Sequence, residues 1–172
     1  MRSTLLLFLL LTVAFGRTAS GSNVITDGKY YDWIVYHTDD LGEEKKCYIV
    51  TLSKADMYIG NYRQKRESPY LMITLSKSSG VMEVGVFAGY DYKKNGSVYL
   101  AVGNKQFRML AKGKMAWNRS VKEDHILIGT MLEHGGDIKV RGETLTGEYT
   151  IDTFSNLGLG RAYERMKQLC RD

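Results

Sequence analysis

The feature of this sequence that most constrains its fold is an alternation of apolar and polar residues with a period of two. It recurs from Asp32 almost to the C-terminus. Strands with one buried and one wet face have this period, and antiparallel sheets are built from them. The expected buried faces are, strand by strand, Trp33 and Val35; Cys47, Ile49 and Thr51; Leu71, Ile73 and Leu75; Met82, Val84, Val86 and Ala88; Val98, Leu100 and Val102; Ile138 and Val140; Tyr149, Ile151 and Thr153.

Two dipeptides favour tight turns between these strands. Asn95-Gly96 and Gly103-Asn104 both tolerate the positive φ angles that hairpins need. They predict a meander through residues 70–111. The segment 55–68 is polar and lacks periodicity, so we expect a long loop before Pro69.

Two segments change to a helical period. Ser120 and Glu123 form a capping box at the start of a helix that ends at Gly135-Gly136, with an expected apolar stripe of Val121, Ile128 and Leu132. A second helix is expected from Ser155 or Asn156, with a stripe of Leu159, Ala162, Met166 and Leu169. Together, these elements predict a mainly β fold: an antiparallel β-sandwich or flattened barrel with two peripheral helices.

The first 20 residues resemble a signal peptide. Arg2 precedes an apolar run from Leu5 to Phe15, and small residues follow it. The run is too short to span a bilayer. We therefore expect residues 1–20 to be removed and residues 21–172 to form one β-rich domain that is exported.

The net charge of the chain argues against nucleic acid as a partner. The whole chain carries +5, and without residues 1–20 it has 22 Lys and Arg against 19 Asp and Glu, a net +3. This excess is too small to indicate nucleic-acid binding. Basic clusters such as Arg63, Lys65 and Arg66 predict a solvated face, or at most peripheral contact with a membrane.

The two cysteines, Cys47 and Cys170, are expected to pair in an oxidising compartment. A bond between them would fasten the last helix to an early strand. The alternatives are a redox pair or half of a zinc site. Neither CxxC spacing nor nearby Cys or His ligands support these alternatives.

No catalytic constellation emerges from the sequence. It lacks HExxH, GxSxG, CxxC and a phosphate-binding glycine loop. The only candidates for a hydrolase are His37 with Asp39 and Asp40, and Asp152, for each of which a polar turn or a wet strand position is the simpler interpretation. We predict that the protein is not an enzyme and that it has no catalytic residues, no cofactor and no metal.

Aromatic residues offer a second kind of site. Trp33, Tyr90 and Trp117 could form a ligand surface for a sugar or peptide. Tyrosine is also a favoured strand residue with one wet end, so packing within the sheet is the simpler explanation of the abundance of tyrosine.

The order of several motifs resembles the bacterial invasion-associated locus B family. The segments that carry the resemblance are 32–36, 46–49, 69–74, 84–89, 102–107, 116–117 and 150–159, with Cys170 at the end. It covers roughly residues 30–170. The sequence departs from the family where Asn156-Leu157-Gly158-Leu159-Gly160 replaces a small-polar-glycine-aromatic turn. Membership implies an exported envelope protein of Gram-negative bacteria, which lies in the periplasm, is associated with the outer membrane, or is secreted. The family provides no catalytic residues to transfer.

Three functions follow in order of preference. The first is a non-catalytic interaction module whose partner is an envelope or host protein. The second is a periplasmic β-domain that binds a small ligand or a glycan. The third is a hydrolase built on His37 or Asp152.

Overall fold

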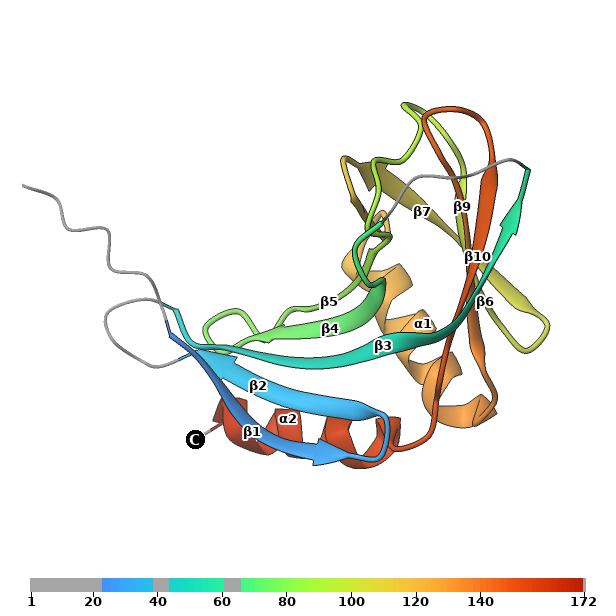
Figure 1. Cartoon of the computed structure of the whole chain (residues 1–172). Coiled ribbons are helices and arrows are strands. Elements are labelled where there is room, and N and C mark those ends of the chain that lie inside the picture. Colours follow the sequence, from blue (N-terminus) through green and yellow to red (C-terminus); the bar gives the residue numbers. More distant parts are fainter. Residues whose placement is uncertain (1–22, 39–43, 61–65, 172) are drawn as a thin grey trace, which may run out of the picture.

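The structure is a computed structural model, and it describes residues 23–38, 44–60 and 66–171. The predicted signal peptide, residues 1–20, lies outside this part of the chain. Within it lie ten strands and two helices (Figure 1). The elements are β1 (Val24–Tyr30), β2 (Trp33–Thr38), β3 (Lys46–Ile59), β4 (Tyr70–Ser76), β5 (Met82–Phe87), β6 (Val98–Val102), β7 (Lys105–Lys112), β8 (Met115–Trp117), α1 (Val121–His134), β9 (Ile138–Glu143), β10 (Tyr149–Phe154) and α2 (Leu159–Arg171).

Eight of the strands form a closed antiparallel barrel. Their order is β3-β10-β9-β6-β7-β8-β5-β4, and β4 pairs back with β3. Strands β1 and β2 extend the sheet outward from β3. The prediction of a mainly β fold with two helices is confirmed. The sandwich alternative is wrong, because the sheet closes on itself instead of splitting into two layers.

Strand β3 belongs to two parts of the sheet. Its first half pairs with β2 and β4, and its second half pairs with β10. A β-bulge divides the halves, since Phe154 pairs with Ser53 and Thr153 pairs with Ala55. A bulge inserts one residue and turns the following side chains to the opposite face. The prediction of a loop from residue 55 is therefore wrong for residues 55–59, which belong to β3. The bulge interrupts the alternation of inward and outward residues, so the period of two is not recognisable in the sequence.

The predicted meander over residues 70–111 is only partly correct. Strands β4 and β5 form one hairpin, and β6 and β7 form another through the turn at Gly103. However, β5 pairs with β8 instead of β6. Asn95 has the expected positive φ of 59°, but its turn connects strands that are not neighbours.

Helix α1 begins and ends where the sequence predicts. The Ser120 side chain caps its first turn by accepting a hydrogen bond from the Glu123 amide, and Gly135 ends it with a φ of 60°. The predicted stripe is wrong in part. Ile128 is buried, but Val121 and Leu132 are exposed. The buried side of the helix is formed by Asp124, Leu127, Ile128, Thr130 and Met131.

Helix α2 begins at Leu159, a few residues after the predicted start. Leu159, Ala162 and Met166 are buried as expected, and Leu169 is partly buried. The helix packs against β1 to β4. Cys170 is bonded to Cys47 on β3, which confirms the predicted disulfide, with a Cα–Cα distance of 5.9 Å.

The expected buried face of β10 is wrong. Thr150, Asp152 and Phe154 point into the barrel and are almost inaccessible to solvent, whereas Tyr149, Ile151 and Thr153 are only partly buried. Both faces of this strand contain apolar and polar residues, so alternation alone does not distinguish them.

Candidate functional site

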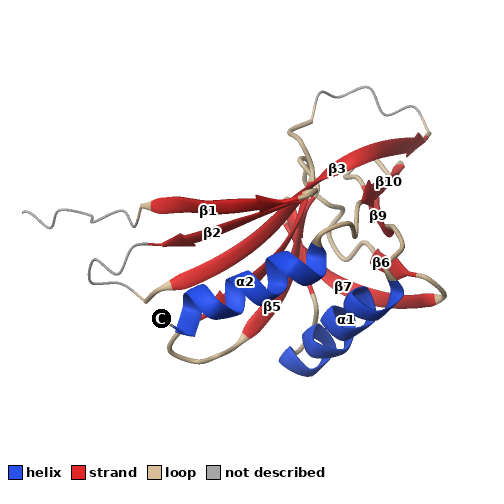
Figure 2. Cartoon of the chain, turned by 90° about the horizontal axis from the view of Figure 1, so that it is seen from below, coloured by secondary structure: helices blue, strands red, loops and turns tan. Residues whose placement is uncertain are grey.

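The side of the sheet opposite both helices carries an apolar and aromatic surface, which we call the outer sheet face. Viewed from below, α1 and α2 lie in front of the strands, and no described helix lies behind them (Figure 2). The apolar residues of the face occupy outward positions on six neighbouring strands: Ile34 and Tyr36 on β2; Tyr48, Val50 and Leu52 on β3; Tyr70 and Met72 on β4; Phe87 on β5; Met115 and Trp117 on β8; Leu110 on β7. Antiparallel sheets usually present polar side chains on such a face.

The strand register arranges this face in three rows. The central row is Ile34, Val50, Met72, Gly85, Trp117 and Leu110. One flanking row is Leu52, Tyr70, Phe87, Met115 and Lys112. The other is Tyr36, Tyr48, Thr74 and Glu83. Because side chains directly opposite on paired strands are in contact range, the rows form one continuous surface.

Gly85 lies at the centre of this surface and lets larger side chains gather above it. A Cβ atom at this position would lie 3.1 Å from the Met72 Cε atom, 3.2 Å from the Met115 Cε atom and 3.4 Å from the Trp117 Nε1 atom. Beside this group, the rings of Tyr70 and Phe87 stack with centroids 4.8 Å apart. The side chains therefore partly cover one another, and most of them are half-buried although no other described element lies over them.

Charged residues are rare in the three rows. Glu83 ends one flanking row and Lys112 ends the other. Both side chains are exposed. An aromatic and Met-rich centre with few charges is the composition of the core of a protein interface.

A hollow of about 500 Å³ lies at the β2 side of the outer sheet face. Ile34, Tyr36 and Val50 supply its apolar wall, and Lys29, Asp32 and Lys54 are among its polar residues. It is open to solvent and has room for a small polar molecule.

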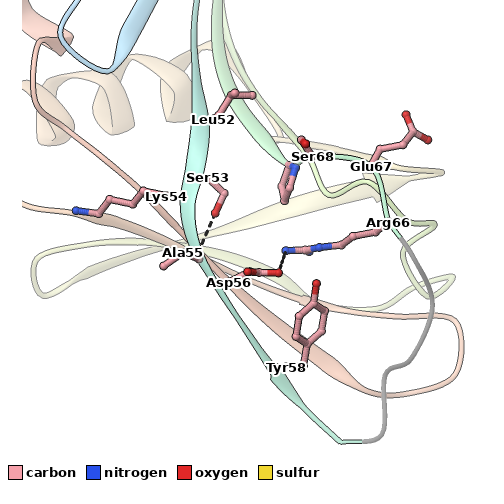
Figure 3. Close-up of a pocket in the computed structure, with 10 residues that line it drawn as sticks. Leu52, Ser53, Lys54, Ala55, Asp56, Tyr58, Arg66, Glu67 and Ser68 are labelled. Atoms are coloured by element: carbon pink, nitrogen blue, oxygen red, sulfur yellow. Dashed lines mark hydrogen bonds and ion pairs between the residues drawn. The ribbon is translucent and has the colours of Figure 1, made fainter.

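A second hollow, of about 410 Å³, lies where β3 and β4 separate (Figure 3). The last backbone hydrogen bond between the two segments runs from the Ser53 amide to the Pro69 carbonyl. Beyond it, β3 continues with β10, while the Glu67 amide bonds to Gly89 instead. Asp56 and Arg66 point toward each other across the hollow, and Tyr58 lies beside them.

The base of this second hollow is a buried ion pair. Two nitrogens of the Arg66 guanidinium donate to the two carboxylate oxygens of Asp152, and both side chains are at most 5% exposed. Arg66 also donates to Asp56 at 3.2 Å and to the Ala88 carbonyl at 3.3 Å. The Tyr90 hydroxyl makes a 2.7 Å hydrogen bond with Thr150, so the mouth of the barrel is filled by a polar network.

Burial and ion pairing have opposing effects on the pKa values of the network. Burial opposes the charge on Arg66, but its hydrogen bond to Asp152 raises the Arg66 pKa above its ordinary value. Burial raises the Asp152 pKa, and the hydrogen bonds from Arg66 act against this effect. A hydrogen bond from Tyr58 lowers the pKa of Asp56. Each carboxylate of the cluster already accepts hydrogen bonds from neighbouring side chains, which suits a structural role better than proton transfer to a substrate.

The hydrolase candidates are not brought together. His37 pairs with Cys47 at one end of β3, and Asp152 pairs with Asp56 nine positions further along that strand. Nine residues of strand span roughly 30 Å. Asp39 and Asp40 lie outside the described residues. The structure thus offers no support for a site that combines His37 with Asp152.

The three aromatic residues predicted to form a ligand surface have different environments. Trp33 is fully buried, and its indole nitrogen donates to the Ser155 carbonyl at 3.0 Å. Tyr90 is 7% exposed and lies in the network at the mouth of the barrel. Trp117 alone lies on the outer sheet face. Trp33 and Tyr90 are therefore core residues and present no surface to a ligand.

Sequence reasoning did not identify the outer sheet face, although the signal was present. Ile34, Val50 and Phe87 are apolar at positions that an alternating strand would turn to water. A comparison of both faces of each predicted strand would have found them. Arg66 gave no such signal, because its partner Asp152 is 86 positions away.

Two searches of the described residues and three comparisons with known proteins gave negative results. The described ranges contain no cluster of three or more His, Cys, Asp or Glu residues suited to a metal ion. Helices of the length and apolarity needed to cross a bilayer are likewise absent from those ranges. No family model, curated protein or solved structure matches the chain.

Proposed function

We propose that the protein is an exported, non-catalytic interaction module of the Gram-negative cell envelope, of the invasion-associated locus B type. The observation that carries the proposal is the outer sheet face. Six strands present aromatic, aliphatic and Met side chains on the side where an antiparallel sheet usually presents polar groups. Extended apolar surfaces of this kind are typical of sites that bind another macromolecule.

The disulfide supports the proposed compartment. The bond between Cys47 and Cys170 is of a kind that persists in the periplasm or outside the cell and is rare in a reducing cytosol. It agrees with the signal-peptide pattern of residues 1–20. The ordered motifs of the resemblance lead to the same localisation.

The proposed absence of catalysis rests on the arrangement of the polar groups. Arg66 forms ion pairs with the buried Asp152 and the exposed Asp56, and both pairs are internal to the fold. A group that donates or accepts a proton in catalysis must reach a substrate. Arg66 and Asp152 face each other instead.

Site-specific photo-crosslinking in the native bacterium tests the proposal. A photoreactive amino acid at Met72 or Met115 is expected to give discrete crosslinked species in the envelope fraction. The same amino acid at Leu145, which is 62% exposed and outside the outer sheet face, is the matched control. Equal yields at all three positions, or none, would contradict an interaction role for this face. Recovery of the protein in the cytoplasm with two titratable thiols would contradict export.

A second candidate function is the binding of a small ligand or glycan in the hollow beside the outer sheet face. The observation in its favour is the volume of about 500 Å³ with both an aromatic wall and charged side chains. Tyr36 supplies an aromatic ring, and Lys29 and Asp32 can form hydrogen bonds. Calorimetric titration with envelope oligosaccharides, compared between the wild type and Tyr36→Ala, would test it. Identical heats for both proteins would reject this site.

A further inference from the structure

We infer that the wall of the barrel carries a further binding site, which takes an acidic polysaccharide. The site consists of three exposed basic residues and two half-buried tyrosines on neighbouring strands, and we call it the basic strip: Arg108 on β7, Tyr99 on β6, Lys139 and Arg141 on β9, and Tyr149 on β10. Apart from β7, these strands carry no residue of the outer sheet face. The inference therefore goes beyond the proposed function and does not depend on it.

The strand register places the two arginines on either side of one tyrosine. Tyr99 lies directly opposite Arg108 on one neighbouring strand and directly opposite Arg141 on the other. Val98 and Leu100, which precede and follow Tyr99, are buried inside the barrel, so Tyr99 and both arginines point outward. Residues that face each other on paired strands lie roughly 5 Å apart, so roughly 10 Å separates the two arginine backbones. The three strands take up two of the eight strand-to-strand steps of the barrel, and the strip is therefore a local patch of its convex wall.

Arg141 is held in a geometry that suits an acidic group. Its guanidinium lies over the ring of Tyr149, 4.1 Å from the centroid. Tyr149 reaches this place from β10, which pairs with β9. A guanidinium stacked on an aromatic ring keeps the N–H groups at its edge available, and these can donate to two oxygens of one carboxylate or phosphate.

The positive charges of the strip have no acidic partner within the fold. Among the described residues, its three basic side chains take part in no ion pair. The acidic residues beside the strip are already paired with other lysines: Asp137 contacts Lys54 at 2.7 Å, and Glu143 contacts Lys93 at 2.5 Å. An excess of three positive charges therefore faces solvent, which is complementary to an acidic partner.

The shape and composition of the strip favour a polysaccharide over a membrane. A flexible polymer can follow the convex wall from Arg108 across Tyr99 to Arg141, with sugar rings against the tyrosine and acidic groups on the arginines. A flat bilayer touches only the crest of such a wall. Proteins that lie on a bilayer also bury apolar side chains in it, and the strip contains no aliphatic side chain that could enter the hydrocarbon.

Calorimetric titration of the exported chain, with its disulfide intact, tests the inference. The probes are polygalacturonate, which carries carboxylates, phosphomannan, which carries phosphates, and neutral dextran. The wild type is expected to bind at least one acidic polymer but not dextran, and to bind more weakly as the salt concentration rises. Arg108→Gln and Arg141→Gln should each weaken binding about 5-fold, and the double variant at least about 10-fold, because each removes one charge-assisted contact at an exposed site.

Arg161→Gln is the matched control. Arg161 is also exposed and also lies over a tyrosine, 5.5 Å from the centroid of the Tyr31 ring, but it belongs to α2. The control removes the same charge and should leave the affinity unchanged. Arg141→Lys keeps the charge but loses the planar guanidinium, and it should not reach the affinity of the wild type. Thermal melting of every variant shows whether the fold is retained.

The inference is overturned if the wild type binds neither acidic polymer, binds dextran equally well, or loses as much affinity in Arg161→Gln as in Arg141→Gln. Loss of binding in Tyr36→Ala, with full binding in Arg108→Gln/Arg141→Gln, would assign the sugar to the hollow beside the outer sheet face instead. Binding to vesicles of anionic phospholipid but to neither polymer would assign the strip to a lipid surface and would also reject the inference. In each of these cases a crosslink from Met72 would still support the proposed function, because Met72 lies on the outer sheet face.

Discussion

The guanidinium of Arg66 contacts both carboxylate oxygens of Asp152 inside the mouth of the barrel, although the two residues are 86 positions apart in the sequence. The contact joins the segment that precedes β4 to the middle of β10. Both side chains are nearly inaccessible to water, at 5% and 2% exposure. A buried pair with two parallel hydrogen bonds fixes the geometry of the two segments, but each charge depends on the other for its stability.

Removal of either partner is therefore expected to be strongly destabilising. Asp152→Ala or Arg66→Ala should lower the free energy of unfolding by about 3–5 kcal/mol, because the remaining charge is buried without its main partner. The double variant Arg66→Met/Asp152→Leu should lose less than either single variant. Urea unfolding measures all three.

Asp56→Asn is the control for this prediction. Asp56 also contacts Arg66, but its side chain is 44% exposed, so water can replace the contact. We expect a loss of less than about 1 kcal/mol. If Asp152→Ala is no more destabilising than Asp56→Asn, the buried ion pair does not hold the two segments together.

Local features were predictable from the sequence, and long-range ones were not. The capping residue Ser120 and the terminal Gly135 act within a few residues of the helix ends, so α1 could be placed correctly. The pairing of β5 with β8 depends on contacts across a whole hairpin and leaves no local pattern. The bulge at Ser53 also prevented a correct prediction. It turns Asp56 and Tyr58 to the opposite face of the strand, so the sequence of β3 shows no regular alternation.

The candidate site was predictable only in part. Trp117 was identified because it is aromatic, but aromatic character alone also selected Trp33, whose ring is buried. The partners of Trp117 on the outer sheet face become visible once the strand order is known, because Met72 and Met115 reach the same place from different strands. Strand order is set by non-local packing, which the alternation of one sequence does not encode.

Acid is expected to weaken the attachment of α2 to β1. Arg165 makes a bidentate contact with Asp27, at 2.9 Å and 2.6 Å, and this hydrogen bonding lowers the Asp27 pKa below its ordinary value of 3.8. A carboxyl group with a lowered pKa in the folded state stabilises the fold above its unfolded-state pKa. That contribution is lost as the pH falls through the lowered value.

The comparison of the wild type with Asp27→Asn tests the predicted direction of the change in stability with pH. We expect a stability difference of about 1 kcal/mol at pH 7, modest because Arg165 is 35% exposed. The difference should be constant down to about pH 4 and shrink below it. Urea unfolding at several pH values gives both curves. A difference that grows in acid would show that another group dominates.

Cleavage of the Cys47–Cys170 disulfide is expected to destabilise the fold strongly. The bond connects residues separated by 123 positions, and closure of so long a loop restricts the unfolded chain. The chain-entropy argument gives about 4–5 kcal/mol at this loop length. The variant Cys47→Ala/Cys170→Ala and the reduced wild type should lose similar amounts. Their urea m-values should rise, because an unfolded chain without the crosslink exposes more surface. An unchanged m-value with a loss below about 1 kcal/mol would contradict this mechanism.

Gly158, directly before α2, is expected to tolerate no side chain. Its φ is 96°, and a Cβ atom would lie 2.0 Å from the Tyr30 carbonyl oxygen. Gly147 has a similar φ of 91°, but a Cβ atom there would meet no other atom within 4 Å, so Gly147→Ala isolates the backbone strain from the clash. We expect Gly147→Ala to lower the free energy of unfolding by about 1 kcal/mol. Gly158→Ala should lower it by at least about 3 kcal/mol, because it must also displace the end of β1 from the start of α2. Equal losses in the two variants would mean that the close approach of Tyr30 to Gly158 does not hold these elements together.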